Sequence, residues 1–327
     1  MDERNPPVVV ICGATAGVGR ATAQRFAASG YRVGLLARGE QALAATQEEL
    51  TQLGATSLAI SVDVADADAV FEAAQRMERE LGPVGVWINC AMVTVLSPIH
   101  QLTAEEIHRV THVTYLGTVH GTLAALDLMG RRNRGVIIQV GSALAYRAIP
   151  LQAAYCAAKF AVRGFTDSLR CELLHEHSDI KVCMVQLPAI NTPQFDWARN
   201  KLAKRPQPVP PIHDPDVAAR AIFSVVKRTP RELWLGVASL KAIVGTCLMP
   251  GLLDRLLARS AYAGQMTDED DDSQRPDNLF EPQESVHRTR GRFNGRSKDS
   301  ALALSSTQVS ALLLATGGLL AVVLLLF

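Results

Sequence analysis

Short apolar runs alternate with helical patterns through residues 8–236 of this 327-residue chain. Continuous apolar runs are typical of parallel strands that are buried on both faces of a sheet. Parallel strands joined through helices predict an α/β fold, a doubly wound parallel sheet of about seven strands with helices on both faces. The expected strands are Val8–Cys12, Val33–Ala37, Leu58–Val62, Val84–Asn89, Gly135–Val140, Lys181–Leu187 and Glu232–Gly236.

A glycine-rich turn follows the first of these runs. Gly13, Gly17 and Gly19 lie between the strand Val8–Cys12 and a helical pattern that begins near residue 17. Glycine permits a tight turn and a close approach of the backbone to phosphate, and a helix N-terminus offers unpaired N–H groups. The turn indicates a dinucleotide-binding site, although a simple strand–helix turn would also use glycine.

A second pattern combines a serine, a tyrosine and a lysine. Tyr155 and Lys159 are four residues apart in an alanine-rich segment, so they should lie on one helix face. A nearby ammonium would lower the pKa of the phenol and allow proton exchange near neutral pH. Ser142 follows a strand and could deliver a second hydroxyl. By itself, a tyrosine–lysine pair could equally be a surface pair without chemical function.

Together these residues resemble the signatures of the short-chain dehydrogenase/reductase family. The glycine turn is similar to the pattern T-G-x-x-x-G-x-G, with Cys12 in place of the Thr. Ser142, Tyr155 and Lys159 match the catalytic Ser and Y-x-x-x-K at the family's spacing. The resemblance implies a Rossmann-type fold and hydride transfer between a nicotinamide and a carbonyl or alcohol carbon. Tyr155 would be the general acid/base, Lys159 would lower its pKa, and Ser142 would orient the substrate oxygen.

The resemblance also implies a set of cofactor-binding residues. Asp63-Val64 is similar to the adenine-contacting pair, Asn89-Cys90-Ala91-Met92 to the N-N-A-G segment, and residues 188–192 to the P-G-x-x-x-T loop on the nicotinamide side. The residues expected to bind the dinucleotide are Gly13, Thr15, Gly17, Val18, Gly19, Arg38, Asp63, Val64, Asn89, Ala91, Tyr155, Lys159, Pro188, Ile190 and Thr192.

The end of the second strand indicates the preferred cofactor. An acidic residue there would bind the ribose 2′-hydroxyl of NAD, whereas an arginine suits the 2′-phosphate of NADP. The strand ends Ala37-Arg38-Gly39, with no carboxylate before Glu40. We expect NADP(H) in preference to NAD(H). A solvated Arg38 without a cofactor role is the alternative.

One position departs from the family pattern. The family has N-x-x-G in the helix after the fourth strand, and its Asn helps to hold a water linked to the Lys. Here Thr114 stands three residues before Gly117, and a hydroxyl lacks the fixed donor and acceptor of an amide. The alternative to an enzyme is therefore a catalytically weak or inactive NADP(H)-binding scaffold or sensor at a membrane. We expect Thr114→Asn to leave activity equal or higher.

The composition argues against several other functions. The net charge is +1 and only 5% of residues are aromatic, which disfavours nucleic-acid binding. The six cysteines form no C-x-x-C pair, so neither a zinc site nor a disulfide framework is indicated. No metal site is expected at His108, His112 and His120, because no carboxylate or cysteine joins them in the pattern. The family resemblance suggests a homodimer or tetramer.

The composition changes near residue 264. Residues 1–263 are expected to form the dinucleotide-binding domain, with a substrate lid over about 193–263. Residues 264–300 are polar and charged, which predicts a disordered linker. The apolar run Val309–Phe327 has about the length of a bilayer core, so residues 301–327 are expected to form a transmembrane tail.

The tail predicts where the protein is found and what it acts on. Basic residues precede the apolar run, so the catalytic domain should face the cytoplasm. A second apolar stretch, Leu240–Leu257, could cover the substrate pocket or lie against a membrane surface. A membrane anchor and an apolar lid together indicate a hydrophobic small-molecule substrate.

Overall fold

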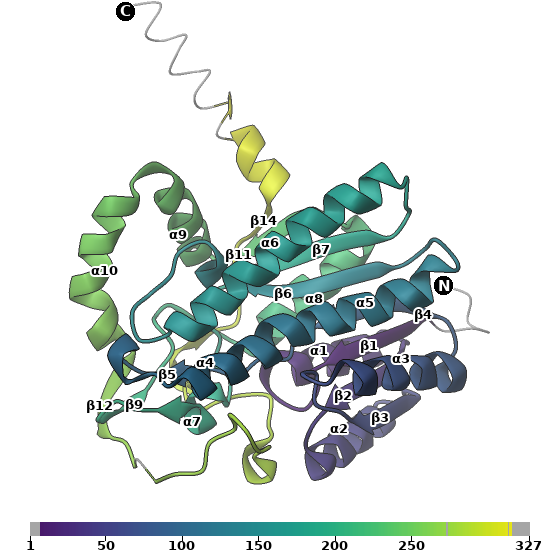
Figure 1. Ribbon diagram of the computed structural model, residues 1–327, viewed down its shortest axis with the longest axis horizontal. Coiled ribbons are helices and arrows are strands. Elements are labelled where there is room, and N and C mark those ends of the chain that lie inside the picture. The colour runs from purple at the N-terminus through teal and green to yellow at the C-terminus, as the bar shows by residue number, and fades with distance from the viewer. Residues whose placement is uncertain (1–6, 273, 313, 316–327) are drawn as a thin grey trace, which may run out of the picture.

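An eight-stranded sheet forms the centre of the protein, in the order β14-β11-β7-β6-β4-β1-β2-β3 (Figure 1). The computed structural model describes residues 7–272, 274–312 and 314–315. Seven strands run parallel, namely β1 (Val8–Cys12), β2 (Arg32–Ala37), β3 (Ser57–Ser61), β4 (Val84–Asn89), β6 (Val136–Ser142), β7 (Lys181–Leu187) and β11 (Glu232–Leu235). These are the seven predicted strands, with small differences at their ends. The eighth, β14 (Ala303–Ser305), pairs antiparallel with β11.

Helices cover both faces of this sheet, as predicted. Successive side chains of β1 point to opposite faces: Val8 and Val10 join one core, whereas Val9 and Ile11 join the other. All four are fully buried. One face is covered by α1 (Gly17–Ala27), α2 (Glu40–Gln52) and α8 (Pro215–Arg228), and the other by α3 (Ala67–Leu81), α5 (Gly117–Gly130) and α6 (Ala153–His175).

The helix after β4 is interrupted by a π-helical turn. Thr103 and Glu106 form a capping box at the start of α4 (Ala104–Thr111). The π turn, His112–Leu116, then joins α4 to α5. A π turn inside a helix is rare and often marks a functional site. It coincides here with Thr114.

Several short elements lie between β7 and α8, and two helices follow β11. Residues 193–213 contain α7 (Gln194–Trp197), β8 (Arg199–Asn200), β9 (Lys204–Pro206) and β10 (Ile212–His213). The short strand β5 (Val95–Leu96) pairs with β8. After β11 come α9 (Val237–Leu248) and α10 (Pro250–Gly264), which stand beside the sheet at its C-terminal end (Figure 1).

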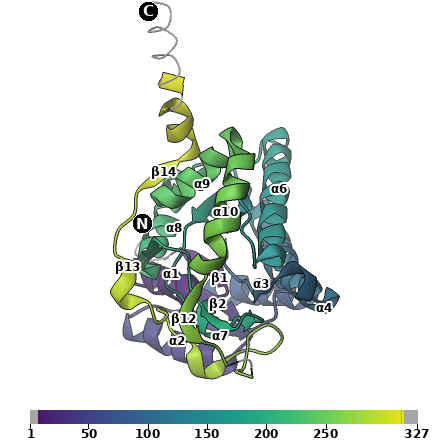
Figure 2. The same cartoon turned by 90° about the vertical axis from the view of Figure 1, so that its left-hand side faces the viewer.

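The segment after Gly264 is packed against the domain, so the expectation of a disordered linker is wrong. It contributes β12 (Met266–Asp270), β13 (Ser297–Lys298) and β14, which pair with β9, β10 and β11. Figure 2 shows its last part, in yellow, along one side of the domain. The composition was misleading because this segment is held mainly by arginine and aspartate side chains that pair with the domain.

The apolar run of the predicted transmembrane tail lies mostly outside the described residues. Of the run Val309–Phe327, residue 313 and residues 316–327 are not described. Within the part of the chain that is described, no helix has both the length and the apolar character needed to cross a bilayer.

Candidate active site

The glycine-rich turn brings backbone segments into close contact at the end of β1. A Cβ atom on Gly13 would lie 2.7 Å from the Cα of Ala91, and one on Gly19 would lie 1.9 Å from the carbonyl oxygen of Gly13. Both positions therefore exclude a side chain. Among the described residues, no side chain caps the N-terminus of α1, and its first turn has no acidic residue. Such a turn suits the pyrophosphate of a dinucleotide.

Ser142, Tyr155 and Lys159 meet near the C-terminal end of β6. Ser142 is the last residue of that strand, and the other two lie one turn apart in α6. The Lys159 side chain is buried, and its Nζ donates to the carbonyl oxygen of Val140 at 2.8 Å. The same Nζ lies 5.7 Å from the centroid of the Tyr155 ring. The structure thus brings the three residues together, as the sequence predicted.

Burial controls the protonation of this cluster. It raises the pKa of Tyr155 above its ordinary value, and a hydrogen bond with Ser142 opposes that shift. It also lowers the pKa of Lys159 to about 8. The sequence led to the opposite expectation for Tyr155, because spacing cannot show how far a phenol is removed from water. At neutral pH the Tyr155 side chain is a neutral phenol that can donate a proton.

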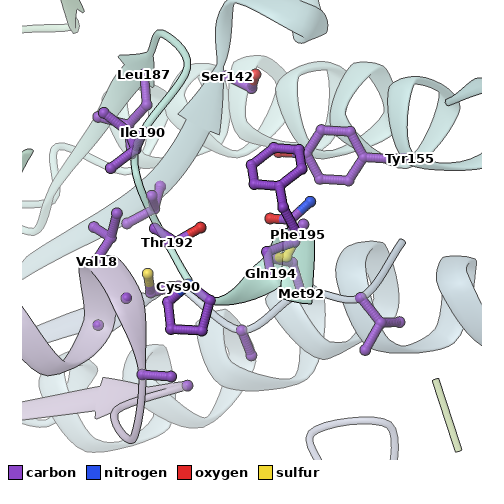
Figure 3. Close-up of a pocket in the computed structure, with 18 of the residues that line it drawn as sticks. Val18, Cys90, Met92, Ser142, Tyr155, Leu187, Ile190, Thr192, Gln194 and Phe195 are labelled. Atoms are coloured by element: carbon purple, nitrogen blue, oxygen red, sulfur yellow. The ribbon is translucent and has the colours of Figure 1, made fainter. Parts of the chain in front are cut away.

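A cavity of about 600 Å³ connects the glycine-rich turn to this cluster (Figure 3). Figure 3 shows Tyr155 on α6, Ile190 and Thr192 after β7, and Val18 in α1, all at its wall. The cavity lies beyond the carboxyl ends of the parallel strands, where doubly wound folds bind ligands. The predicted site residues that line it are Gly13, Thr15, Gly17, Val18, Gly19, Arg38, Asp63, Val64, Ala91, Ser142, Tyr155, Lys159, Pro188, Ile190 and Thr192.

Asn89 was predicted to bind the cofactor, but it lies beneath the cavity. Its side chain is 3% exposed. Its Oδ1 accepts from the indole N–H of Trp87 at 2.9 Å, and its Nδ2 donates to Thr122 and Gln139 at 3.1 and 2.9 Å. Asn89 therefore satisfies a buried polar network instead of contacting a ligand.

Thr114 also lies outside the cavity wall. Its side chain is fully buried. The hydroxyl donates to the carbonyl oxygen of Val93 at 3.1 Å and accepts from the Val93 N–H at 3.2 Å. Both hydrogen bonds tie the π turn to the segment after β4. The hydroxyl is thus engaged by the Val93 backbone on both its donor and its acceptor side.

The charged residues at the other end of the cavity are paired within the protein. Asp63 Oδ2 accepts from Arg109 Nη2 at 2.6 Å. Arg38 donates to the carbonyl oxygens of Phe280 and Asn278 at 2.5 and 2.6 Å. Burial lowers the pKa of Arg38, and the neighbouring Arg109 adds to that effect. In this arrangement two of the five N–H groups of Arg38 are engaged by backbone carbonyl oxygens.

Helices α9 and α10 line the end of the cavity near Tyr155. Most of the side chains that they and their neighbours contribute are apolar. The lining residues of this end are Ile149, Phe195, Val209, Ala238, Ser239, Ala242, Leu257, Ser260 and Ala261.

Sequence reasoning missed the part of the wall that comes from the C-terminal segment. Its lining residues are Asn278, Pro282, Gln283, Glu284 and His287. One signal was available: Leu279 and Phe280 form an apolar pair inside a polar stretch. Leu279 is fully buried and joins the main core.

Known proteins share this sequence pattern and this fold. Residues 7–202 match the family model of short chain dehydrogenases. The uncharacterized oxidoreductase YxnA of Bacillus subtilis (strain 168) is 32% identical over 260 residues, which are 79% of this chain and 73% of that protein.

Two solved structures have similar folds. An alcohol dehydrogenase from the archaeon Thermococcus sibiricus, complexed with 5-hydroxy-NADP, has a TM-score of 0.61 and 26% identity, and covers 70% of this chain and 96% of its own. A short chain dehydrogenase/reductase from Burkholderia phymatum, in complex with NAD, has a TM-score of 0.68 and 22% identity over 78% of this chain and 96% of its own. The second likeness concerns the fold alone.

Proposed function

Because this chain belongs to the short chain dehydrogenase family of oxidoreductases, we propose that it interconverts a carbonyl group and a primary or secondary alcohol. The cofactor is a nicotinamide dinucleotide, which supplies or takes up the hydride when bound. One observation carries the proposal: Ser142, Tyr155 and Lys159 share a single cavity with the glycine-rich turn.

Each of the three residues has a role that its environment supports. Tyr155 donates its phenolic proton to the oxygen of a carbonyl substrate during reduction and takes it back during oxidation. Its raised pKa keeps the phenol protonated at neutral pH, which favours the reductive direction. Ser142 orients the same substrate oxygen. Lys159, when charged, stabilises the phenolate that forms and holds the nicotinamide ribose.

The wall of the cavity near Tyr155 supports a hydrophobic substrate. Phe195, Val209 and Leu257 line this end together with small residues of α9. Burial of apolar surface would favour substrates with longer alkyl or ring systems. For a series of aldehydes of increasing chain length, kcat/KM should rise with each methylene. A preference for small polar carbonyls would contradict this.

The test of the activity is the oxidation of NADH and NADPH by the full chain over a panel of aldehydes and ketones. Tyr155→Phe should reduce kcat by about 10²- to 10⁴-fold, the usual contribution of a general acid. Cofactor binding, followed by nicotinamide fluorescence, should be retained in this variant. If the wild type binds a dinucleotide but reduces no carbonyl, the scaffold or sensor alternative replaces the enzyme.

We also propose that the chain is anchored to a membrane through Val309–Phe327, with the catalytic domain on the cytoplasmic side. The apolar run and the basic residues before it support this. Leu248, Met249 and Leu252, at the junction of α9 and α10, are about half or more exposed. Full-length protein should resist carbonate extraction from membranes, whereas Leu320→Arg should release it. Complete extraction of the wild type would overturn the anchor.

A homodimer or tetramer is the proposed assembly. Leu123 on α5 and Phe160 on α6 are each more than 40% exposed, although both are large and apolar. An interface that covers them would bury this surface. Light scattering in mild detergent should give a multiple of the chain mass. A monomer at micromolar concentration would contradict the proposal.

A further inference from the structure

Residues 278–291, called here the C-terminal strap, lie across the cofactor half of the cavity. Leu279 anchors one end in the core, and Arg109 donates to its carbonyl oxygen at 2.9 Å. At the other end, the N–H of Gly17 donates to the carbonyl oxygen of Arg288 at 3.0 Å. Between them the short turn η4 (Glu284–Val286) packs against α2 (Figure 1). The strap is therefore a fixed part of the cavity wall.

One strap residue, Glu284, occupies a specific position at the end of β2. Gly39, two residues after β2 and directly before α2, has no side chain there. A Cβ atom on Gly39 would lie 2.9 Å from each carboxylate oxygen of Glu284. Both residues line the cavity. The strap thus places a carboxylate where the side chain of residue 39 would begin, although the two positions are 245 residues apart in the sequence.

The carboxylate is held there by the first turn of α2. Glu284 Oε2 accepts from the N–H of Ala42 at 2.9 Å. A side chain at residue 39 would ordinarily cap this N–H, and glycine cannot. A purely structural reading is that Glu284 does no more than cap the helix. A cap requires an acceptor oxygen but no negative charge, so the two readings can be separated by experiment.

The same strap engages the arginine on which a 2′-phosphate would depend. The guanidinium of Arg38 donates to the strap carbonyl oxygens of Asn278 and Phe280. A phosphate group at the end of β2 would face the Glu284 carboxylate and would have to compete with two strap carbonyl oxygens for the N–H groups of Arg38. A ribose 2′-hydroxyl would instead donate to that carboxylate, which is a favourable charge-assisted hydrogen bond.

We propose that Glu284 is the specificity-determining residue for the cofactor, and that it selects NAD(H) over NADP(H) from the C-terminal strap. This rests on the proposed function only in requiring that a nicotinamide dinucleotide occupies the cavity. It reverses the preference that the sequence suggested, because Arg38 and Gly39 could be interpreted only with the strap in place. The family match ends at residue 202, so it does not include the strap.

The experiment compares the dissociation constants of NADH and NADPH for the full chain, measured by calorimetry without substrate. The wild type should bind NADH more tightly. Glu284→Gln keeps the size of the side chain and an acceptor for the Ala42 N–H but removes the charge. It should shift the ratio of the two constants towards NADPH by about 10- to 100-fold. The matched control is Glu176→Gln, which removes the same charge from an exposed residue at the end of α6, outside the cavity wall, and should leave the ratio unchanged.

A second pair of variants tests the position of the charge. Glu284→Ala should lose the NADH preference, and Gly39→Asp added to it should restore the preference from the neighbouring position. Gly39 has φ −80°, so an aspartate fits its backbone. Equal changes for both cofactors in Glu284→Gln would assign Glu284 to helix capping and overturn the proposal. So would tighter binding of NADPH by the wild type.

Two further outcomes would distinguish a failure of the selectivity proposal from a failure of the proposed activity. If the wild type binds neither dinucleotide and Leu279→Asp binds both, the strap is an inhibitory cover and the selectivity proposal fails. If the ratio shifts as expected but no carbonyl is reduced, Glu284 selects the cofactor and the proposed activity is what fails. Binding and turnover are measured separately for this reason.

Discussion

The parallel sheet and the C-terminal strap both form the wall of one cavity, but different forces hold them. Strands β1 and β4 are almost completely buried and apolar. The strap has one deeply buried apolar anchor, Leu279, and is otherwise tied by hydrogen bonds and ion pairs, such as those of Arg290 with Asp214 and Asp216. Hydrophobic burial is strong and non-directional, whereas an exposed ion pair contributes about 0–1 kcal/mol.

This difference assigns different functions at the site to the sheet and to the strap. The sheet fixes the backbone that approaches a pyrophosphate and the residues that transfer a proton. The strap adds Glu284 and restrains Arg38 where the adenosine ribose would lie. Changes in the sheet should therefore abolish binding or chemistry, and changes in the strap should alter selectivity or local mobility. The predictions below test that division from the largest effect to the smallest.

The largest effect is expected from Gly19→Val. Its Cβ would lie 1.9 Å from the carbonyl oxygen of Gly13, which is backbone and cannot move aside. The turn must distort, so dinucleotide binding should weaken by at least about 100-fold, as for a loss of two or three hydrogen bonds to phosphate. Calorimetric titration with NADH measures this. Gly164→Ala is the control, since its Cβ would meet open space; binding by Gly19→Val at wild-type affinity would refute the expectation.

A substitution at Thr114 should affect stability next. Thr114→Val removes both hydrogen bonds to Val93. The buried N–H and carbonyl oxygen of Val93 then lose the hydroxyl as their partner. The free energy of unfolding should fall by about 1–3 kcal/mol for each group left unsatisfied. Chemical denaturation measures the loss, and Thr114→Ser should retain most of the stability.

The same geometry revises the expectation for Thr114→Asn. An asparagine in place of a fully buried, doubly hydrogen-bonded threonine has to fit a larger amide into a closed space. We now expect lower stability and no gain in kcat. An Asn variant that is as stable as the wild type and more active would restore the interpretation drawn from the family pattern.

Sequence reasoning succeeded where a signal is local and periodic. Apolar runs predicted the seven parallel strands because a strand buried on two faces requires them. The glycine turn and the Tyr155–Lys159 pair were also recognisable, since each depends on spacing within one element. Fifteen of the predicted site residues line the cavity.

The remaining features depend on contacts between distant segments. Asn89 matched a pattern, yet its partners Thr122 and Gln139 draw it into the core. The missing carboxylate at Gly39 is supplied by Glu284, which no local pattern can connect to it. The strap was mistaken for a linker because its composition is polar, and paired charges have the same composition as unpaired ones.

The pH dependence of reduction should follow the sheet-held lysine. Burial lowers the pKa of Lys159 to about 8. Lys159 loses its charge as the pH rises through that value, while Tyr155 remains protonated because burial raises its pKa. The rate of carbonyl reduction should therefore fall above about pH 8, approaching tenfold per unit. Initial rates at saturating cofactor between about pH 6 and 10 measure it.

The strap should not influence the pH at which the rate of reduction begins to fall. Glu284→Gln changes a charge at the far end of the cavity, whereas the shift of the Lys159 pKa comes from burial, opposed by Cys90. In that variant the rate of reduction should begin to fall at the same pH as in the wild type. A constant rate through pH 9.5 in the wild type would show that the charge of Lys159 is not required.

The smallest effect is expected from the ion pairs at the end of the strap. Asp196 on α7 accepts from Arg288 at 2.7 Å and from Arg292 at 2.6 Å. Asp196→Asn removes the charge from both pairs but keeps a polar side chain of the same size. Local opening of the strap should become easier by about 1 kcal/mol, so its backbone amides should exchange hydrogen roughly fivefold faster. Exchange in peptides that cover residues 278–293 measures this.

The exchange experiment is interpreted by comparing the amides of the strap with those of the sheet. Amides of β1 and β4 open only with global unfolding, so their exchange should not change in Asp196→Asn. Glu80→Gln is the matched control, because it removes one exposed ion pair with Arg76 on α3, away from the strap. Equal acceleration in strap and sheet would mean that the two unfold as one cooperative unit. In that case the ion pairs would stabilise the whole domain, and the strap could not change selectivity without changing the fold.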